Sequence, residues 1–248
     1  MCEWCGCGQP NDSYHEHSHE HNHSDTSKIV ELNKSILEEN NRIALKNKEH
    51  IEALGAVGIN FISSPGSGKT TLLQETIKRL KPRIKVGVIE GDIETQRDAQ
   101  RIREQKVPVV QLTTGGACHL DARLVHKGIH QLEHELDDKV LDFLFIENVG
   151  NLVCPASFYL GEHKRVVLVS VPEGSDKPAK YPKAFMEADL FIISKIDLLD
   201  YFDFSIDEAK EEALKLNPRL DIICLSSVTG EGMDEWINYL LRLIKKDE

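Results

Sequence analysis

The chain has 248 residues and a formal net charge of −11, with 40% hydrophobic and 29% charged residues. This composition is typical of a soluble globular protein that is long enough to bury a core. The negative charge argues against a nucleic-acid partner, and no apolar run reaches the roughly 20 residues of a membrane span. Because the chain does not begin with a basic segment followed by an apolar one, we expect no secretory signal and a cytoplasmic location.

Residues 1–27 are rich in cysteine and histidine and contain almost nothing apolar, so we expect this tail to be disordered without a ligand. Cys2, Cys5 and Cys7 offer three thiolates, and removal of Met1 would add the amine of Cys2. Such a set suits Ni²⁺ or Cu²⁺ in a planar site or Zn²⁺ in a tetrahedral one, with redox-active or idle thiols as the alternative. A run of alternate histidines follows and is typical of weak Ni²⁺ or Zn²⁺ storage sites. These histidines are His15, His17, His19, His21 and His23.

A long amphipathic helix is predicted over residues 28–54, where apolar side chains recur at helical spacing among charged ones. Residues 25–27 offer N-caps, and Gly55 offers a stop. We expect the apolar stripe of this helix to pack on the domain that follows, although a partner protein could also use it.

Residues 55–248 alternate apolar runs with helical patterns, and the last predicted helix covers residues 232–246. This alternation predicts an α/β domain with a mostly parallel sheet flanked by helices. The predicted strands cover residues 57–62, 84–90, 107–112, 142–146, 165–171, 189–194 and 220–225.

A glycine-rich turn follows the first predicted strand and leads into a predicted helix, as in a P-loop NTPase. Ser63 departs from the G-x-x-x-x-G-K-S/T pattern, because it stands where the first glycine is expected. Backbone N–H groups of such a turn surround phosphate oxygens, Lys69 reaches the β- and γ-phosphates, and the Thr70 hydroxyl holds Mg²⁺. A turn that merely connects two elements is the alternative. The predicted phosphate-binding residues are Ser64, Pro65, Gly66, Ser67, Gly68, Lys69, Thr70 and Thr71.

Two acidic residues follow predicted strands. Asp92 comes after the second strand, and Glu147 comes after the fourth, at the position of the aspartate in a D-x-x-G motif. Because the carboxyl ends of parallel strands meet at the edge that carries the phosphate loop, both residues are candidates for holding Mg²⁺ and for a switch function. Either could instead be a solvated carboxylate. Together with Lys69 and Thr70, they form the predicted catalytic set.

Base recognition is assigned to the run Ser194-Lys195-Ile196-Asp197, which follows an apolar strand and is similar to the N-K-x-D motif of GTPases. In that motif the aspartate accepts hydrogen bonds from guanine and the lysine stem lies along the ring. Ser194 replaces the asparagine that usually braces the site. Ser226 and Ser227 follow the last strand, as the guanine-contacting loop of GTPases does, so the predicted nucleotide is GTP.

A second metal site is predicted inside the domain. Cys118 and His119 follow the third predicted strand, and Cys154 follows the loop that begins at Glu147, so the three side chains could converge on one ion. Cys224 is interpreted as a buried strand residue. Histidines at helical spacing after His119 are interpreted as a solvated helix face, with the first of them a weak ligand candidate. They are His126, His130 and His134.

These motifs together resemble those of the HypB family, the nickel-insertion accessory GTPases of nickel–iron hydrogenase maturation. The resemblance rests on the cysteine-rich start, the histidine tract and the phosphate loop. It rests also on G-A-C-H-L-D at residues 116–121 and E-N-V-G-N-L-V-C-P at residues 147–155. These segments span most of the chain, and the last two are the most specific. Ser194 departs from the asparagine that is usual in the family.

The resemblance implies slow GTP hydrolysis, a GTP-dependent homodimer, and nickel transfer to maturation partner proteins or to the hydrogenase large subunit. It also implies a tight nickel site at Cys2, Cys5 and Cys7, and a weaker Zn²⁺ or Ni²⁺ site at the internal cluster. A lysine beyond the switch region reaches the partner's nucleotide in the family, and Lys180 is the best-placed candidate here.

Because Cys154 and Glu147 share one loop, we expect bound GTP and Mg²⁺ to change the metal geometry. The sequence offers three alternative functions. A urease accessory GTPase characteristically carries Cys-Pro-His, whereas Ala156 follows Cys154-Pro155 here. A nickel storage protein would leave the nucleotide motifs unexplained. An ATP-dependent kinase conflicts with Lys195 and Asp197.

Overall fold

The computed structural model describes residues 23–92 and 101–244, and for residues 23–33 and Asp92 it describes the backbone only. The tail residues Cys2, Cys5 and Cys7 and the histidines up to His21 therefore lie outside the described part of the chain.

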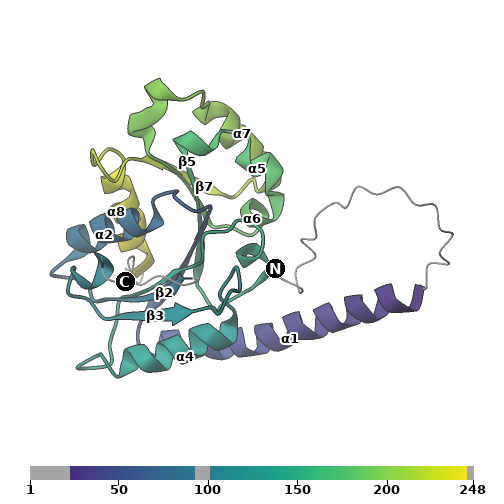
Figure 1. The fold of residues 1–248 in the computed structure, drawn as a ribbon. Helices are drawn as coiled ribbons and strands as arrows, with labels where there is room; N and C mark the ends of the chain where they lie inside the picture. Colours follow the sequence, from purple (N-terminus) through teal and green to yellow (C-terminus); the bar gives the residue numbers. More distant parts are fainter. Residues whose placement is uncertain (1–22, 93–100, 245–248) are drawn as a thin grey trace.

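Seven strands form one sheet in which every neighbouring pair is parallel, in the order β3-β2-β4-β1-β5-β6-β7 (Figure 1). Each of the seven predicted strands is confirmed, with no end shifted by more than two residues. The strands are β1 (Val57–Ser63), β2 (Val86–Asp92), β3 (Val109–Thr113), β4 (Phe143–Glu147), β5 (Lys164–Ser170), β6 (Leu190–Ser194) and β7 (Asp221–Leu225).

Helices cover both faces of the sheet, because the central strands are apolar on both sides. On β4, Phe143 and Phe145 pack in the core beneath α2 and α8, whereas Leu144 and Ile146 pack in the core beneath α1 and α4. The helices are α1 (His23–Ala53), α2 (Lys69–Leu80), α4 (Ala122–Glu133), α5 (Lys177–Lys180), α6 (Pro182–Met186), α7 (Ile206–Leu216) and α8 (Met233–Ile244). No helix of the described residues is both long and apolar enough to cross a lipid bilayer.

Helix α1 begins at His23, before the expected start at residue 28, and its N-terminal part extends beyond the sheet (Figure 1). Its C-terminal part packs on the domain, as the apolar stripe predicts, and buries Ala44 and Ile51 completely. The fully buried Asn47 fixes this contact, because its Nδ2 atom donates hydrogen bonds to the carbonyls of Ala122 and Leu160 at 2.8 and 3.0 Å.

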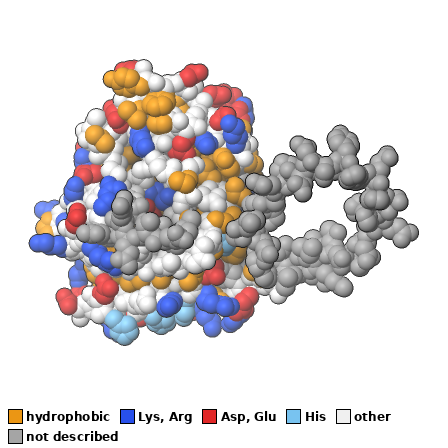
Figure 2. Space-filling view, viewed as in Figure 1, with side chains coloured by type: hydrophobic (Ala, Val, Ile, Leu, Met, Phe, Trp, Pro, Cys, Tyr) orange, Lys and Arg blue, Asp and Glu red, His pale blue; other side chains and the backbone are white. Residues whose placement is uncertain are grey.

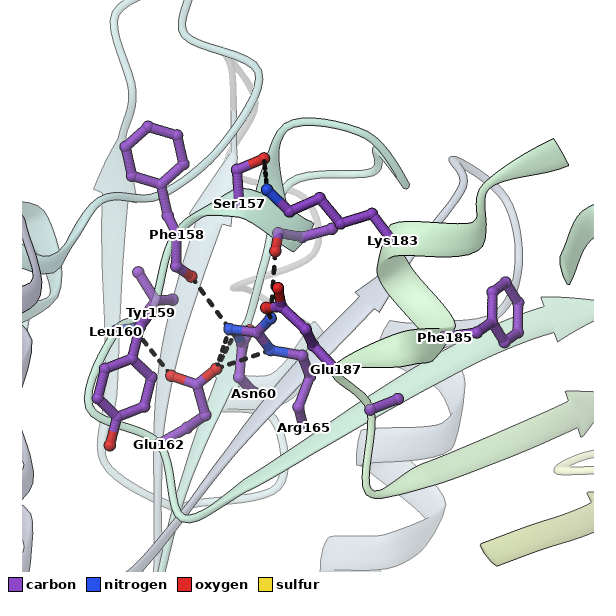
Figure 3. A network of polar contacts seen from close by, with 12 residues as sticks. Asn60, Ser157, Phe158, Tyr159, Leu160, Glu162, Arg165, Lys183, Phe185 and Glu187 are labelled. Carbon is purple, nitrogen blue, oxygen red and sulfur yellow. Dashed lines mark hydrogen bonds and ion pairs between the residues drawn. The ribbon is translucent and has the colours of Figure 1, made fainter. Parts of the chain in front are cut away.

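A buried ion pair holds the segment that precedes β5 (Figure 3). The guanidinium of Arg165 binds the Glu162 carboxylate at 2.7 Å and donates to the backbone carbonyls of Ala156 and Phe158 at 3.2 and 3.3 Å. The same carboxylate accepts from Asn60 Nδ2 on β1 at 3.2 Å. This network fixes the chain that comes directly after Cys154.

Candidate functional site

A cleft of about 490 Å³ opens at the carboxyl ends of the central strands. Parallel sheets place ligands at this edge, next to the strand where the chain order reverses. Its lining residues are Pro65, Gly66, Ser67, Gly68, Lys69, Thr70, Thr71, Glu90, Gly91, Arg101, Glu147, Asn148, Val149, Gly150 and Lys195. All but one of the predicted phosphate-binding residues therefore lie around one cleft, and the exception, Ser64, comes directly after β1.

The phosphate loop joins β1 to the first residue of α2, Lys69. Gly66 and Gly68 have φ angles of +75° and +95°, a conformation that side-chain-bearing residues rarely adopt. The loop therefore needs glycine at both positions. The α2 N-terminus that it leads into directs backbone N–H groups and a partial positive charge at the cleft.

Ser63, the departure from the phosphate-loop pattern, binds the loop lysine. Lys69 Nζ donates to Ser63 Oγ at 2.8 Å, and Ser67 Oγ lies 2.5 Å from the same oxygen. Ser63 Oγ in turn donates to the carbonyl of Ser64 at 2.8 Å. The serine hydroxyl thus braces the loop and holds the Lys69 ammonium inside it.

The predicted Mg²⁺ ligands Thr70 and Glu147 lie together. Thr70 Oγ1 donates to Glu147 Oε1 at 2.7 Å, and both residues are buried. Glu90 stands beside Glu147 in the strand register and lines the same cleft. One hydroxyl and two carboxylates are the oxygen donors that Mg²⁺ prefers, so these residues fit the ion. The side chain of Asp92 lies outside the described atoms, although its backbone ends β2 at this edge.

The loop after β4 touches the phosphate loop directly. A Cβ atom on Gly150 would lie 2.9 Å from Pro65 Cα, which is closer than real contacts allow. Only glycine therefore permits this approach. Because the two loops are in close contact, a movement of the phosphate loop would displace the loop that leads to Cys154.

The predicted base-binding run braces the phosphate loop. Ser194 Oγ donates to the carbonyl of Ser67 at 2.8 Å, so this serine retains the bracing contact expected of an asparagine. Lys195 Nζ donates to the carbonyl of Gly66 at 2.7 Å. Asp197 Oδ1 is buried and has no hydrogen-bond partner among the described residues, as suits an acceptor for a ligand donor.

The loop after β7 begins with Ser226, which is fully buried. Its Oγ accepts hydrogen bonds from the backbone N–H groups of Val228 and Thr229, both at 3.2 Å. Ser226 therefore shapes the loop, and Ser227 is the partly exposed member of the pair.

Sequence reasoning missed two charged residues of the cleft, Glu90 and Arg101. The guanidinium of Arg101 donates to Thr71 Oγ1 at 3.2 Å and to Gln74 Oε1 at 2.9 Å. Nothing near Arg101 in the sequence marks it, because its role depends on packing against α2. Glu90 shares the strand face of Asp92 by the two-residue period, which was the signal that could have identified it.

The three side chains predicted to share a metal ion, those of Cys118, His119 and Cys154, lie together. Cys118 Sγ lies 2.8 Å from Cys154 Sγ and 3.9 Å from His119 Nδ1, and the ligand atoms of all three residues lie within 4.8 Å of one another. Burial lowers the pKa of His119 below its ordinary value, and Asp121 opposes part of that shift. His119 also stacks on Phe158 with 4.0 Å between ring centroids. A neutral imidazole beside two thiols is a donor set that fits Zn²⁺ or Ni²⁺.

Hydrogen bonds join this cluster to the nucleotide cleft. The buried Asn148 accepts from the backbone N–H of Leu120 at 3.1 Å, and Asn151 Nδ2 donates to the carbonyl of Cys118 at 3.4 Å. Asn151 also forms a backbone bridge with Ser63 of the phosphate loop. The loop from Glu147 to Cys154 therefore contacts both sites.

Other predicted positions lie elsewhere. Lys180 is exposed and pairs with Asp176 at 2.5 Å, away from the residues that line the cleft. Cys224 is half-buried on β7, and burial raises its pKa. The expected solvated position is confirmed for His130 and for His134, the C-cap residue of α4, whereas His126 is partly buried and contacts His130.

Comparisons with known proteins give a consistent result. The model of the CobW/HypB/UreG nucleotide-binding domain family matches residues 58–224. The hydrogenase maturation factor HypB of Escherichia coli K12 is 47% identical over 213 residues, which cover 86% of this chain and 72% of that protein.

Two solved structures are also similar. The crystal structure of HypB from Helicobacter pylori in complex with nickel is 43% identical, with a TM-score of 0.80 over 84% of this chain and 95% of that one. The crystal structure of the hydrogenase maturation factor HypB from Archaeoglobus fulgidus is 40% identical, with a TM-score of 0.77 over 84% of this chain and 100% of that one. The chain therefore belongs to the CobW/HypB/UreG family and, within it, to the HypB hydrogenase maturation factors.

Proposed function

We propose that the protein is a GTP-hydrolysing nickel metallochaperone that delivers Ni²⁺ during maturation of nickel–iron hydrogenase. The observation that carries the proposal is that one loop, from Glu147 to Cys154, contacts both the nucleotide cleft and the thiol–imidazole cluster. The names of the similar proteins support the same function, because they are hydrogenase maturation factors and one was crystallised with nickel.

In this proposal the phosphate loop and Lys69 bind the phosphates of GTP, and Asp197 and Lys195 bind guanine. Asp197 accepts hydrogen bonds through the buried oxygen that lacks a partner among the described residues. Thr70 and Glu147, with Asp92 or Glu90, would hold Mg²⁺, which would neutralise phosphate charge when bound. Hydrolysis is slow, as the resemblance to the HypB family implies.

Nickel is the cargo. Cys118, His119 and Cys154 bind it at the internal site, where Zn²⁺ is a competing occupant with the same ligand preference. The tail cysteines, Cys2 and its neighbours, form the tighter site, and the histidine tract serves as a store.

The protein acts as a GTP-dependent homodimer and passes nickel to maturation partners or to the hydrogenase large subunit. Lys180 reaches across the dimer to the nucleotide of the other copy, after it leaves its exposed pair with Asp176.

Phosphate release from GTP and hydrogenase activity in cells that lack their own maturation factor test the proposal together. The wild-type protein should hydrolyse GTP and restore hydrogenase activity in limiting nickel. Lys69→Ala should lose both activities, whereas Cys118→Ala should lose restoration but keep hydrolysis. Restoration by Lys69→Ala at the wild-type level would contradict the role of GTP.

A further inference from the structure

A second cluster of metal-ligating side chains lies between α1 and α4, outside the sites described above. One ring nitrogen from each of His50, His126 and His130 lies within 4.8 Å of those of the other two. The first residue is on α1 and the others are on consecutive turns of α4. Histidine side chains gather at the bottom of Figure 2, along the edge of the molecule where α4 runs in Figure 1.

The tautomer of His126 follows from its buried neighbour Asn47. The Asn47 amide nitrogen donates to two backbone carbonyls, so its Oδ1 atom must be the acceptor in the contact with His126 Nδ1 at 2.9 Å. His126 therefore carries its proton on Nδ1, and its Nε2 atom is left with an exposed lone pair. This is the arrangement of a metal-binding histidine, in which a hydrogen bond from one nitrogen orients the other.

A carboxylate orients the other two imidazoles. Glu133 Oε2 lies 3.1 Å from His50 Nε2 and 3.4 Å from His130 Nδ1. A proton on His130 Nδ1 faces this oxygen, and so His130 Nε2 is the atom that faces the cluster. Metal-bound histidines usually have a carboxylate partner of this kind.

The spacing between the facing nitrogens matches that of a bound ion. His126 Nε2 and His130 Nε2 are 3.3 Å apart. Two nitrogens bound at about 2.0–2.1 Å to a tetrahedral ion are separated by roughly 3.3 Å. Two lone pairs at this distance repel each other unless a proton or a metal cation lies between them.

We propose that His50, His126 and His130 bind one divalent transition-metal ion of the Zn²⁺ or Ni²⁺ class, with Glu133 holding the imidazoles in place. This site has no thiol, is separate from the Cys118 cluster and does not depend on bound GTP. Because its ligands come from two helices, the bound ion holds α1 against α4. The stability of this helix contact therefore depends on the metal concentration. The half-exposed side chain of His130 provides the entry path.

Hydrogen–deuterium exchange of the full-length protein, with Zn²⁺ or Ni²⁺ added, tests the proposal. The parent protein and every variant also carry Cys118→Ser and Cys154→Ser, so that metal binding at the thiol cluster contributes no signal. The metal should slow exchange at least tenfold in the C-terminal turns of α1 and in α4, and equilibrium dialysis should show one more bound ion than in the variant below.

His130→Gln is the test variant because its exposed side chain can change without loss of the Asn47 contact. It should lose the slowed exchange and one bound ion, as should His126→Gln. His134→Gln is the matched control, because this exposed histidine lies just past the end of α4, and the variant should behave as the parent. The proposal would be overturned if the parent and His130→Gln showed the same exchange protection and the same number of bound ions, or if neither ion protected the parent. The short distance between the two imidazoles would then be explained by a shared proton.

Discussion

Asn148→Ala should break the link between the nucleotide cleft and the internal metal cluster. The Asn148 side chain is buried, accepts from the N–H groups of Leu120 and Val149 at 3.1 and 3.0 Å, and donates to Asn60 Oδ1 at 3.3 Å. Each buried bond contributes about 1 kcal/mol, and an orphaned donor costs about 1–3 kcal/mol. We therefore expect the free energy of unfolding to fall by about 2–4 kcal/mol.

Asn148→Ala should also weaken the coupling between the bound nucleotide and the affinity of the metal cluster. Without Asn148, the chain at Leu120 is no longer tied to the loop that follows Glu147, so the metal cluster should respond less to the nucleotide. Allosteric coupling free energies of about 1–3 kcal/mol correspond to roughly 5- to 150-fold differences in affinity. The ratio of nickel affinities in the GTP-analogue and GDP states should therefore fall toward one.

Urea denaturation measures the first quantity, and chelator competition with each nucleotide measures the second. Asn217→Ala is the matched control, because Asn217 also bonds backbone groups, donating to the carbonyls of Phe185 and Ala188 at 3.3 and 2.8 Å, but lies away from the site. The control should lose stability and keep the affinity ratio. An Asn148→Ala protein that loses stability but keeps the full ratio would refute the reasoning.

Three further substitutions test other parts of the account. Gly150→Ala should slow GTP hydrolysis about 10- to 100-fold, measured as phosphate release, because its Cβ would displace Pro65 from 2.9 Å. Asp197→Asn should weaken GTP binding by about 10²-fold in a fluorescent-nucleotide titration, since charged hydrogen bonds are lost; unchanged affinity would remove Asp197 from the base site. Arg165→Ala should lower the free energy of unfolding by about 3–5 kcal/mol in urea, because the buried Glu162 carboxylate loses its partner (Figure 3); a change below about 1 kcal/mol would contradict this.

The fold was predictable because local pattern and packing agree. Apolar runs such as the one before Ser194 are buried on both sides, and β6 is confirmed from Leu190 to Ser194. The start of α1 was predicted too late. Its polar residues 25–27 suit an N-cap, but nothing among them breaks a helix, and α1 continues back to His23.

The candidate site was predictable where a motif fixes the spacing. Lys69, Thr70 and Cys118 were predicted from such motifs, and the structure places the first two at the cleft and the third in the thiol–imidazole cluster. Glu90 and the His50 cluster did not follow, because strand register and the docking of α1 bring together residues far apart in the sequence. Register and helix docking arise from the packing of the whole core, which no local pattern encodes.

The central claim is that the nucleotide controls the metal cluster, and nickel affinity measured in two nucleotide states tests it most directly. The measurement uses the full-length protein with Cys2, Cys5 and Cys7 changed to Ala, because these substitutions remove the expected tight nickel site of the tail. Competition with a chelator then gives the affinity of the internal cluster with GDP and with a GTP analogue. The two affinities should differ at least fivefold, and this difference should disappear in Cys154→Ala. Equal affinities in the two states would contradict it.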